Sequence, residues 1–162
     1  MKSLDRLTRR ALLAAGGGTL AATALAIAAP AYARYEVTMT DAEWRAKLGP
    51  DRFRILRQAG TERAWSSPLN KEKRKGIFTC AGCNLPLFSS ATKFDSGTGW
   101  PSFWKPLPNA IATSRDAAFG MVRVEEHCRR CGGHLGHIFD DGPPPTGKRH
   151  CINGLSLNFR PA

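Results

Sequence analysis

The segment of residues 133–153 brings together side chains that could carry out thiol chemistry. Cys151 lies there with three of the four histidines of the chain, and with aspartates and an arginine. A thiol attacks as its thiolate, and imidazole and guanidinium groups nearby lower the thiol pKa and exchange protons. The cluster consists of His134, His137, Asp140, Asp141, Arg149, His150 and Cys151. Spacing alone leaves two interpretations open, a nucleophilic Cys151 and a reduced, buried structural cysteine.

The other four cysteines form two C-x-x-C pairs, Cys80 with Cys83 and Cys128 with Cys131. Four thiolates match a tetrahedral zinc ion, whereas two disulfides or a redox-active pair are the alternatives in an exported protein. We expect one structural zinc ion per chain, because four cysteines fill its coordination sphere and leave no position open for a reaction. This pairing leaves Cys151 as an unpaired thiol, which favours the catalytic interpretation.

The elements that must position these groups follow from the hydrophobic pattern. Residues 40–43 have the form of a capping box and predict a short helix to about Leu48, and residues 51–59 predict a second one. Trp44 is expected to face the core between them. From Gly76 onward, short apolar or alternating runs are separated by Gly, Pro, Asn and Asp, which is typical of antiparallel strands. The chain is therefore predicted to be mainly β, with two short N-terminal helices.

The first 33 residues have the features of an export signal. Arg9 and Arg10 precede an uncharged run from Ala11 to Ala33, which ends in a small-x-small cleavage site at residues 31–33. We therefore expect residues 1–33 to be a twin-arginine-type signal peptide, residues 34–162 to be the mature domain, and the location to be periplasmic. The alternative is an uncleaved leader that anchors the protein in a membrane, because the run is long enough to span one.

The charge of the chain bears on a binding function. The formal net charge is +11, from 24 Lys+Arg and 13 Asp+Glu, and the basic residues are scattered except for a short run at residues 71–75. A zinc-ribbon-like domain that binds nucleic acid would need basic and aromatic residues clustered on one face. A second rival, a Cys/His hydrolase, would need an oxyanion hole and an acyl substrate. The dispersed charge and the export signal argue against nucleic acid as a partner.

Four motifs occur in a distinctive order. They are CAGC at residues 80–83 followed by Pro86-Leu87-Phe88, KFDSGTGWPSF at 93–103, the second cysteine pair running into GHLGHIFDDGP at 133–143, and RHCIN at 149–153. Together they closely resemble the B-type peptide-methionine (R)-S-oxide reductases. The resemblance extends over residues 40–159, nearly the whole predicted mature chain.

The resemblance implies a fold of two antiparallel sheets, of the β-tent or Mss4-like kind, with the zinc away from the catalytic centre. It also implies a protein-repair enzyme that reduces methionine (R)-sulfoxide in oxidised proteins or peptides. Cys151 matches the nucleophile of that family, His137 its acid/base residue, and Trp100 the aromatic side chain that holds the substrate methyl group. The residues that match positions organising the site are His134, Asp141, Arg149 and Asn153.

The expected chemistry transfers the sulfoxide oxygen to the thiol. The sulfoxide sulfur is electrophilic and its oxygen must be protonated, so attack by Cys151 would give methionine and a sulfenic acid that a second thiol must reduce. Many family members carry a resolving cysteine where this chain has Thr98, so we expect a thioredoxin-like or small-thiol reductant instead. His150 also departs from the tyrosine frequent before the nucleophile. We expect a monomer with no nucleic-acid partner and no stable membrane association.

Overall fold

The computed structural model describes residues 35–117 and 122–162, so the expected leader, residues 1–33, lies outside the described residues. In chain order the elements are α1 (Asp41–Gln58), η2 (Pro68–Lys71), β1 (Gly76–Cys80), β2 (Pro86–Ser89), η3 (Ser90–Thr92), β3 (Lys93–Phe94), β4 (Ser102–Phe103), β5 (Ile111–Asp116), β6 (Arg123–Cys128), β7 (His134–Phe139), β8 (Arg149–Ile152), η5 (Gly154–Ser156) and β9 (Leu157–Pro161). None of the helices in these two ranges is long and apolar enough to cross a membrane.

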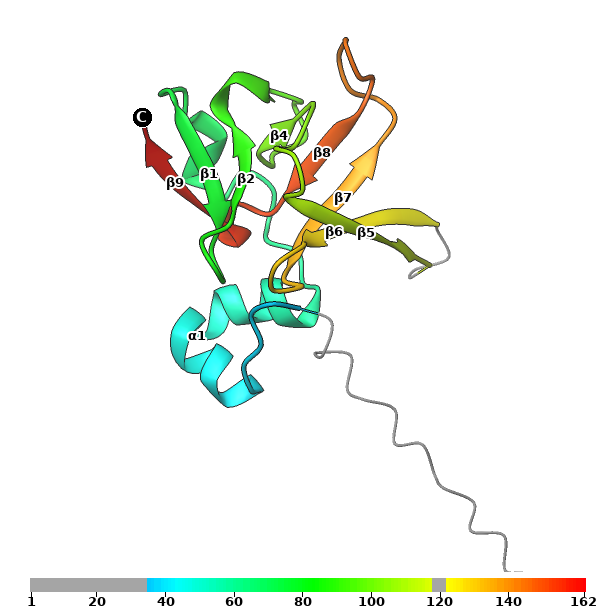
Figure 1. Cartoon of the computed structure of the whole chain (residues 1–162). Coiled ribbons are helices and arrows are strands. Elements are labelled where there is room, and N and C mark those ends of the chain that lie inside the picture. Colours follow the sequence, from blue (N-terminus) through cyan, green and yellow to red (C-terminus); the bar gives the residue numbers. More distant parts are fainter. Residues whose placement is uncertain (1–34, 118–121) are drawn as a thin grey trace, which may run out of the picture.

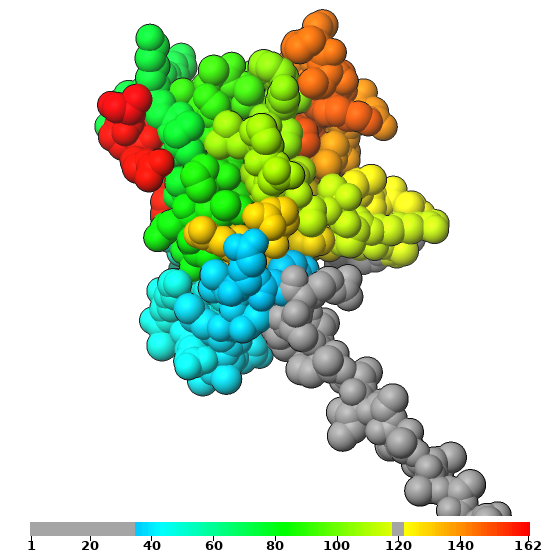
Figure 2. Space-filling model, viewed as in Figure 1, coloured from blue at the N-terminus to red at the C-terminus, as the bar shows by residue number. Residues whose placement is uncertain are grey.

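The strands form two antiparallel sheets. One has three strands in the order β2-β1-β9, and the other has six in the order β3-β4-β8-β7-β6-β5. In Figure 1 the three-stranded sheet lies at the left, and β5 and β6 project to the right from the longer sheet. Figure 2 shows residues 35–60, in blue and cyan, as a lobe below the strands. The prediction of a mainly β fold with two antiparallel sheets is confirmed.

The two expected N-terminal helices form the single element α1, interrupted at Gly49. Thr40 and Glu43 complete the predicted capping box, in which the Thr40 side chain accepts from the Glu43 N–H and the Glu43 carboxylate accepts from the Thr40 N–H. Gly49 has φ 71° and ψ 172° and is not helical. The next residue, Pro50, has a ring that disfavours helical geometry in the residue before it. The chain therefore turns between two helical segments.

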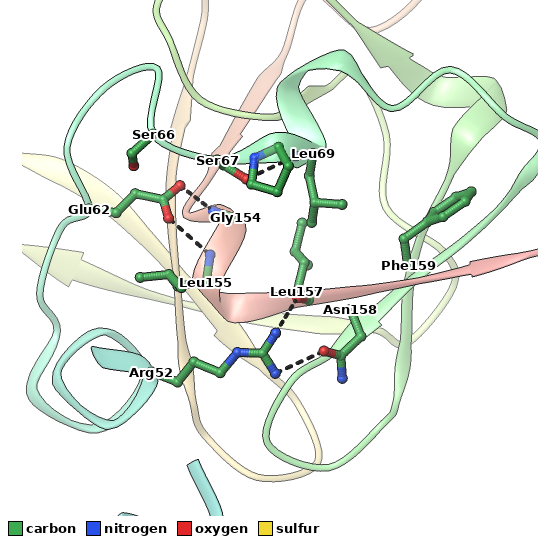
Figure 3. Close-up of a pocket in the computed structure, with 11 residues that line it drawn as sticks. Arg52, Glu62, Ser66, Ser67, Leu69, Gly154, Leu155, Leu157, Asn158 and Phe159 are labelled. Carbon is green, nitrogen blue, oxygen red and sulfur yellow. Dashed lines mark hydrogen bonds between the residues drawn. The ribbon is translucent and has the colours of Figure 1, made fainter. Parts of the chain in front are cut away.

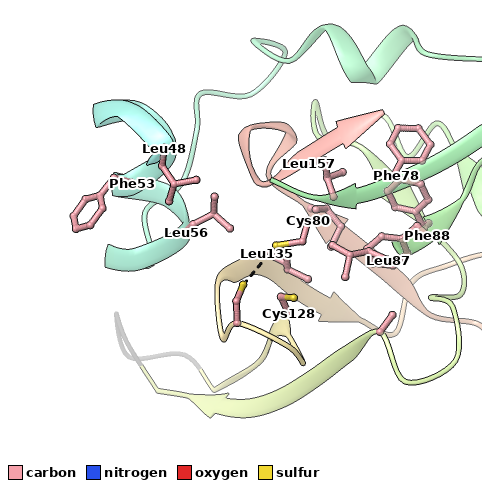
Figure 4. Close-up of a cluster of buried hydrophobic side chains, with 14 of the residues drawn as sticks. Leu48, Phe53, Leu56, Phe78, Cys80, Leu87, Phe88, Cys128, Leu135 and Leu157 are labelled. Atoms are coloured by element: carbon pink, nitrogen blue, oxygen red, sulfur yellow. Dashed lines mark hydrogen bonds between the residues drawn. The ribbon is translucent and has the colours of Figure 1, made fainter. Parts of the chain in front are cut away.

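Aromatic rings join the two sheets. Phe88 on β2 stacks on Phe103 on β4 with ring centroids 4.4 Å apart, and Phe78 on β1 meets Phe103 edge-on at 5.0 Å. All three rings are 0% exposed, and a fully buried ring of this size stabilises the fold by about 2–3 kcal/mol. Leu48 and Leu56 point from α1 toward the sheets (Figure 4), so the helix closes one end of the same core.

The pairing of β7 with β8 depends on a residue without a side chain. Gly136 lies opposite Ile152, and a Cβ atom built on Gly136 would lie 1.9 Å from the carbonyl oxygen of Cys151. No side chain fits at that distance from a backbone atom, so glycine is required for the two strands to approach. The close approach places His137, the next residue of β7, directly opposite Cys151.

Candidate active site and metal centre

Cys151 and His137 occupy facing positions on neighbouring strands. Directly opposite residues of an antiparallel pair project their side chains from the same face of the sheet. Both residues line a pocket of about 140 Å³, together with Trp100 and Asn153. The remaining lining residues are Thr61, Arg123, Gly136 and Phe139. The pocket therefore brings together the nucleophile, the acid/base residue and the aromatic side chain predicted from the sequence.

Burial has the largest effect on the Cys151 thiol and raises its pKa above the ordinary value of 9.0. The positive charge of Arg149 and a hydrogen bond from Thr98 act in the opposite direction. Arg149 therefore lowers the pKa of Cys151 as expected, but the expectation of a net lowering is wrong, because desolvation has the larger effect. The resting group at neutral pH is therefore a thiol, whose proton would have to be removed before the sulfur could act as a nucleophile.

A chain of hydroxyl groups holds Thr98 at the sulfur. The Thr98 hydroxyl lies 2.8 Å from the Ser96 hydroxyl, which lies 2.8 Å from that of Ser102. Ser102 is directly opposite Cys151 on β4 and lies 3.2 Å from the carbonyl oxygen of Trp100. Each hydroxyl is both donor and acceptor, so the chain can direct its hydrogens toward a negative sulfur or away from a protonated one.

Asp116 fixes the proton arrangement of His137. The Nε2 atom of His137 lies 2.8 Å from Oδ2 of Asp116, which also accepts a hydrogen bond of 2.7 Å from Arg123. An ionised carboxylate only accepts, so Nε2 carries the hydrogen and Nδ1 is the nitrogen that can take up a proton. Burial lowers the pKa of His137 below its ordinary value of 6.5, and the hydrogen bond to Asp116 partly offsets this effect. Sequence reasoning missed Asp116, which belongs to no motif around the thiol.

His134 supports the site from beside it and does not line the pocket. It is 4% exposed, its Nδ1 lies 2.7 Å from the Glu125 carboxylate, and its ring centroid is 5.6 Å from that of His137. The hydrogen bond with His134 lowers the pKa of Glu125. Glu125, which also accepts from Ser114, was not predicted from the sequence. Its position directly opposite His137 on β6 becomes visible only once the strands are paired.

Arg149 and Asp141 form a two-bond ion pair at the end of β8. The guanidinium donates to both carboxylate oxygens at 2.8 and 2.9 Å and lies 4.3 Å from the centroid of the Phe139 ring. The Asp141 side chain is 63% exposed and does not line the pocket. The structure therefore places Asp141 where it can orient Arg149, and Arg149 where its charge acts on Cys151.

Glu62 connects Trp100 to Asn153. Its carbonyl oxygen accepts from Trp100 Nε1 at 3.2 Å, and its N–H donates to the Asn153 side chain at 3.0 Å. Its carboxylate accepts from the N–H groups of Gly154 and Leu155, the residues that begin η5 (Figure 3). This buried residue was also missed by sequence reasoning, because its four hydrogen-bond partners are distant in the chain.

A larger pocket, of about 470 Å³, lies against the Glu62 carboxylate (Figure 3). Arg52 and Leu157 are among its lining residues, and no cysteine or histidine is. It offers neither a thiol nor an imidazole to a bound molecule. We therefore assign the chemistry to the smaller pocket at Cys151.

His150 faces away from the pocket. Successive side chains of a strand point to opposite faces, so His150 enters the core while Cys151 faces the pocket. Its Nδ1 lies 2.8 Å from the carboxylate of Glu126, which is 0% exposed, and its ring packs against Phe88. The departure noted at this position therefore changes the core beneath the nucleophile and leaves the pocket lining unchanged.

The four remaining cysteines converge from two turns. Cys80 and Cys128 end β1 and β6, and Cys83 and Cys131 lie in the turns that follow. All four Sγ atoms lie within 4.8 Å of one another, with Cys80 and Cys131 at 3.7 Å and Cys83 and Cys128 at 3.5 Å. Metal–sulfur bonds of 2.3 Å in a tetrahedron separate the sulfurs by about 3.8 Å, whereas a disulfide needs about 2 Å. The residues therefore fit one tetrahedral metal ion, and Figure 4 shows Cys80 and Cys128 at the edge of the core.

Fold and site together define a two-sheet β protein with a thiol–imidazole pocket and a separate four-cysteine site. The family of the SelR domain matches residues 48–161. A protein of Agrobacterium fabrum named peptide methionine sulfoxide reductase MsrB is 53% identical over 127 residues, which are 78% of this chain and 94% of that protein. A protein of the same name from Thiobacillus denitrificans is 55% identical over 123 residues, which are 75% of this chain and 93% of that protein. The chain therefore belongs to the SelR domain family, that of the MsrB proteins.

We expect Cys128→Ser to remove the metal and to lower the melting temperature. The free energy of metal binding contributes directly to folding at such a site, and the serine oxygen replaces a thiolate poorly. Metal analysis of the purified protein, together with thermal unfolding, checks this. Cys151→Ser is the matched control and should keep one metal ion per chain. A wild-type protein with no metal and two disulfides by mass would contradict the assignment.

Proposed function

We propose that this enzyme reduces methionine (R)-sulfoxide in oxidised proteins or peptides to methionine, with Cys151 as the nucleophile. One observation carries the proposal: Cys151 and His137 face each other across β7 and β8 and line one pocket with Trp100. Membership of the MsrB family supports sulfoxide reduction as the reaction. The hydrolase and nucleic-acid alternatives have no comparable support.

The path of the thiol proton follows from the directions in which burial shifts the pKa values of Cys151 and His137. In the resting pocket Cys151 is a thiol and His137 is neutral, because burial disfavours the charged form of each. His137 takes the thiol proton at Nδ1 as the sulfur attacks, and delivers it to the sulfoxide oxygen. The protonated oxygen then moves from the methionine sulfur to the Cys151 sulfur while the bond formed between the two sulfurs breaks, so the products are methionine and the sulfenic acid Cys–S–OH. Arg149 and Thr98 stabilise the negative sulfur during the transfer.

Stereochemistry follows from two fixed contacts. The substrate methyl group rests on Trp100, and the sulfoxide oxygen points to His137. The sulfoxide sulfur must face Cys151. With these three directions fixed, only one hand at sulfur places the third substituent, the methylene that leads to the peptide, toward solvent. The resemblance to the B-type reductases assigns the R epimer to this geometry.

We propose zinc as the ion of the four-cysteine site, with a structural role. Four sulfur ligands suit zinc and leave no open coordination position. A bound zinc ion supplies four metal–sulfur bonds that tie the β1–β2 turn to the β6–β7 turn. Cys80, Cys83, Cys128 and Cys131 therefore have no part in the proposed reaction, and they are not available to reduce the sulfenic acid.

We also propose that the domain is exported by its twin-arginine-type leader, works in the periplasm as a monomer, and is recycled there by a thioredoxin-like protein or a small thiol. Arg9-Arg10 and the Ala31-Tyr32-Ala33 cleavage site support export. Amino-terminal sequencing of the periplasmic protein should begin near Arg34. A start at residue 1 or 2 in the membrane fraction would favour an anchored leader instead.

The proposed reaction is tested by assaying the two separated sulfoxide epimers of a blocked methionine with dithiothreitol. The R epimer should be reduced, and the S epimer should react at less than about one hundredth of that rate, equivalent to about 3 kcal/mol. Cys151→Ser should abolish turnover without changing the melting temperature or the metal content. Comparable rates for both epimers, or an active Ser variant, would contradict the proposal.

Thr98 generates a separate prediction about recycling. Its hydroxyl lies close enough to Cys151 to lower the thiol pKa, so we expect a thiol at this position to be within reach of the sulfenic acid. After one turnover without reductant, the wild type should therefore carry a sulfenic acid on Cys151 that dimedone traps. Thr98→Cys should instead form an intrachain disulfide and lose the dimedone adduct, while Thr98→Ser should retain it. A wild-type mass that falls by two hydrogens, with no adduct, would mean that another cysteine resolves the intermediate.

A further inference from the structure

Trp65 is a large apolar side chain that the fold leaves in solvent. It is 64% exposed, an exposure that only Val122 matches among the large hydrophobic side chains of residues 35–117 and 122–162. Burying an indole would stabilise the fold by a few kcal/mol. The exposed indole of Trp65 does not make that contribution. Exposed tryptophans are enriched where proteins bind other chains. The exposed indole of Trp65 therefore contributes little to folding and is free to contact another molecule.

The position of Trp65 is fixed by its contact with the loop that carries the substrate-binding aromatic. Trp65 has φ 67°, a left-handed conformation that tryptophan rarely adopts, and its N–H donates to the Gly99 carbonyl at 2.7 Å. Gly99 has φ 95°, and a Cβ there would lie 3.0 Å from the Trp65 indole. The indole therefore lies against the backbone next to Trp100, held in an uncommon conformation.

A pocket of about 290 Å³ opens between these residues. Trp65 and Phe94 contribute aromatic surface to it, and Trp100 contributes to both this pocket and the one that holds Cys151. The two pockets are thus neighbours across a single side chain. An extended peptide advances about 3.4 Å per residue, so a chain with its oxidised methionine at Cys151 reaches this pocket within about three residues.

The polar groups of this pocket favour a negatively charged occupant. Lys71 is exposed there, and Lys93 is half-buried with its ammonium donating to the Asn70 carbonyl at 2.8 Å. Asp95 is the one acidic residue of the lining, and one of its carboxylate oxygens accepts from the Gly97 N–H.

We propose that this pocket is a substrate subsite that binds an acidic residue flanking the oxidised methionine. The indole of Trp65 covers the peptide backbone, and Lys71 and Lys93 pair with the carboxylate. The inference rests on the proposed function and adds to it a sequence preference among oxidised proteins. A segment with Glu or Asp within three residues of the oxidised methionine is then the favoured substrate.

The test compares a blocked methionine (R)-sulfoxide amide with three heptapeptides that carry the same residue at their centre, flanked by Glu, Gln or Lys. For the wild type at low salt, kcat/KM should be about fivefold higher with Glu than with Lys flanks, and the difference should shrink in high salt. Lys71→Glu should abolish or reverse this order. Lys47→Glu, a charge reversal on α1 outside the pocket lining, is the matched control and should preserve it.

Trp65→Gly, which suits the left-handed backbone, should raise KM for all three peptides by about fivefold to tenfold and leave the amide unaffected, while Trp65→Phe should restore part of the loss. Equal kcat/KM for the three peptides, or an equal loss with the amide and the peptides, would overturn the subsite. If the wild type fails to reduce even the amide, the proposed function itself is wrong. If it reduces the amide but ignores the flanking residues, only the subsite is wrong.

Discussion

The pairing of β7 with β8 is the constraint on which the site depends. Strand pairing places His137 opposite Cys151, and this register holds only because Gly136 has no side chain to meet the Cys151 carbonyl. A shift by one residue would turn His137 into the core and separate it from the thiol. The imidazole and the thiol are thus held together by backbone hydrogen bonds, a more rigid support than a loop provides.

The remaining contacts keep this strand pair in place and complete the pocket. The four-cysteine cluster connects the turn that precedes β7 to the turn between β1 and β2, and Arg57 of α1 donates to the Cys131 carbonyl at 3.0 Å. Glu62, in the loop after α1, connects Trp100 by hydrogen bonds to the backbone that follows β8. The pocket thus draws its walls from segments far apart in the chain, which strand pairing and hydrogen bonds join to β7, to β8 or to the residues just after β8.

The sequence predicted the parts of this arrangement that local patterns record. Capping residues identified α1, alternation identified the strands, and cysteine spacing identified the metal-binding cluster. It could not predict Asp116 or Glu62, because each acts through contacts with distant segments and belongs to no motif. It also gave the wrong direction for the Cys151 pKa, since the sequence displays neighbouring charges such as Arg149 but does not display burial. The motifs therefore named the candidate reacting groups, and the structure was needed to assign their pKa directions.

In the proposed reaction, Cys151 and His137 act as one pair that is reactive when the two groups share a single proton. The most direct measurement is the pH dependence of kcat/KM for the wild type and for Asp116→Asn, because this profile reports the pKa values of the free enzyme. The wild type should lose activity in acid at a pH below 6.5 and in base at a pH above 9.0, the ordinary values of the two groups, since burial lowers the pKa of His137 and raises that of Cys151. Asp116→Asn replaces the carboxylate, which raises the pKa of His137 through its hydrogen bond and its charge, by a neutral amide, so the acid limb should move to lower pH. An acid limb that stays in place or moves to higher pH in the variant would contradict the account.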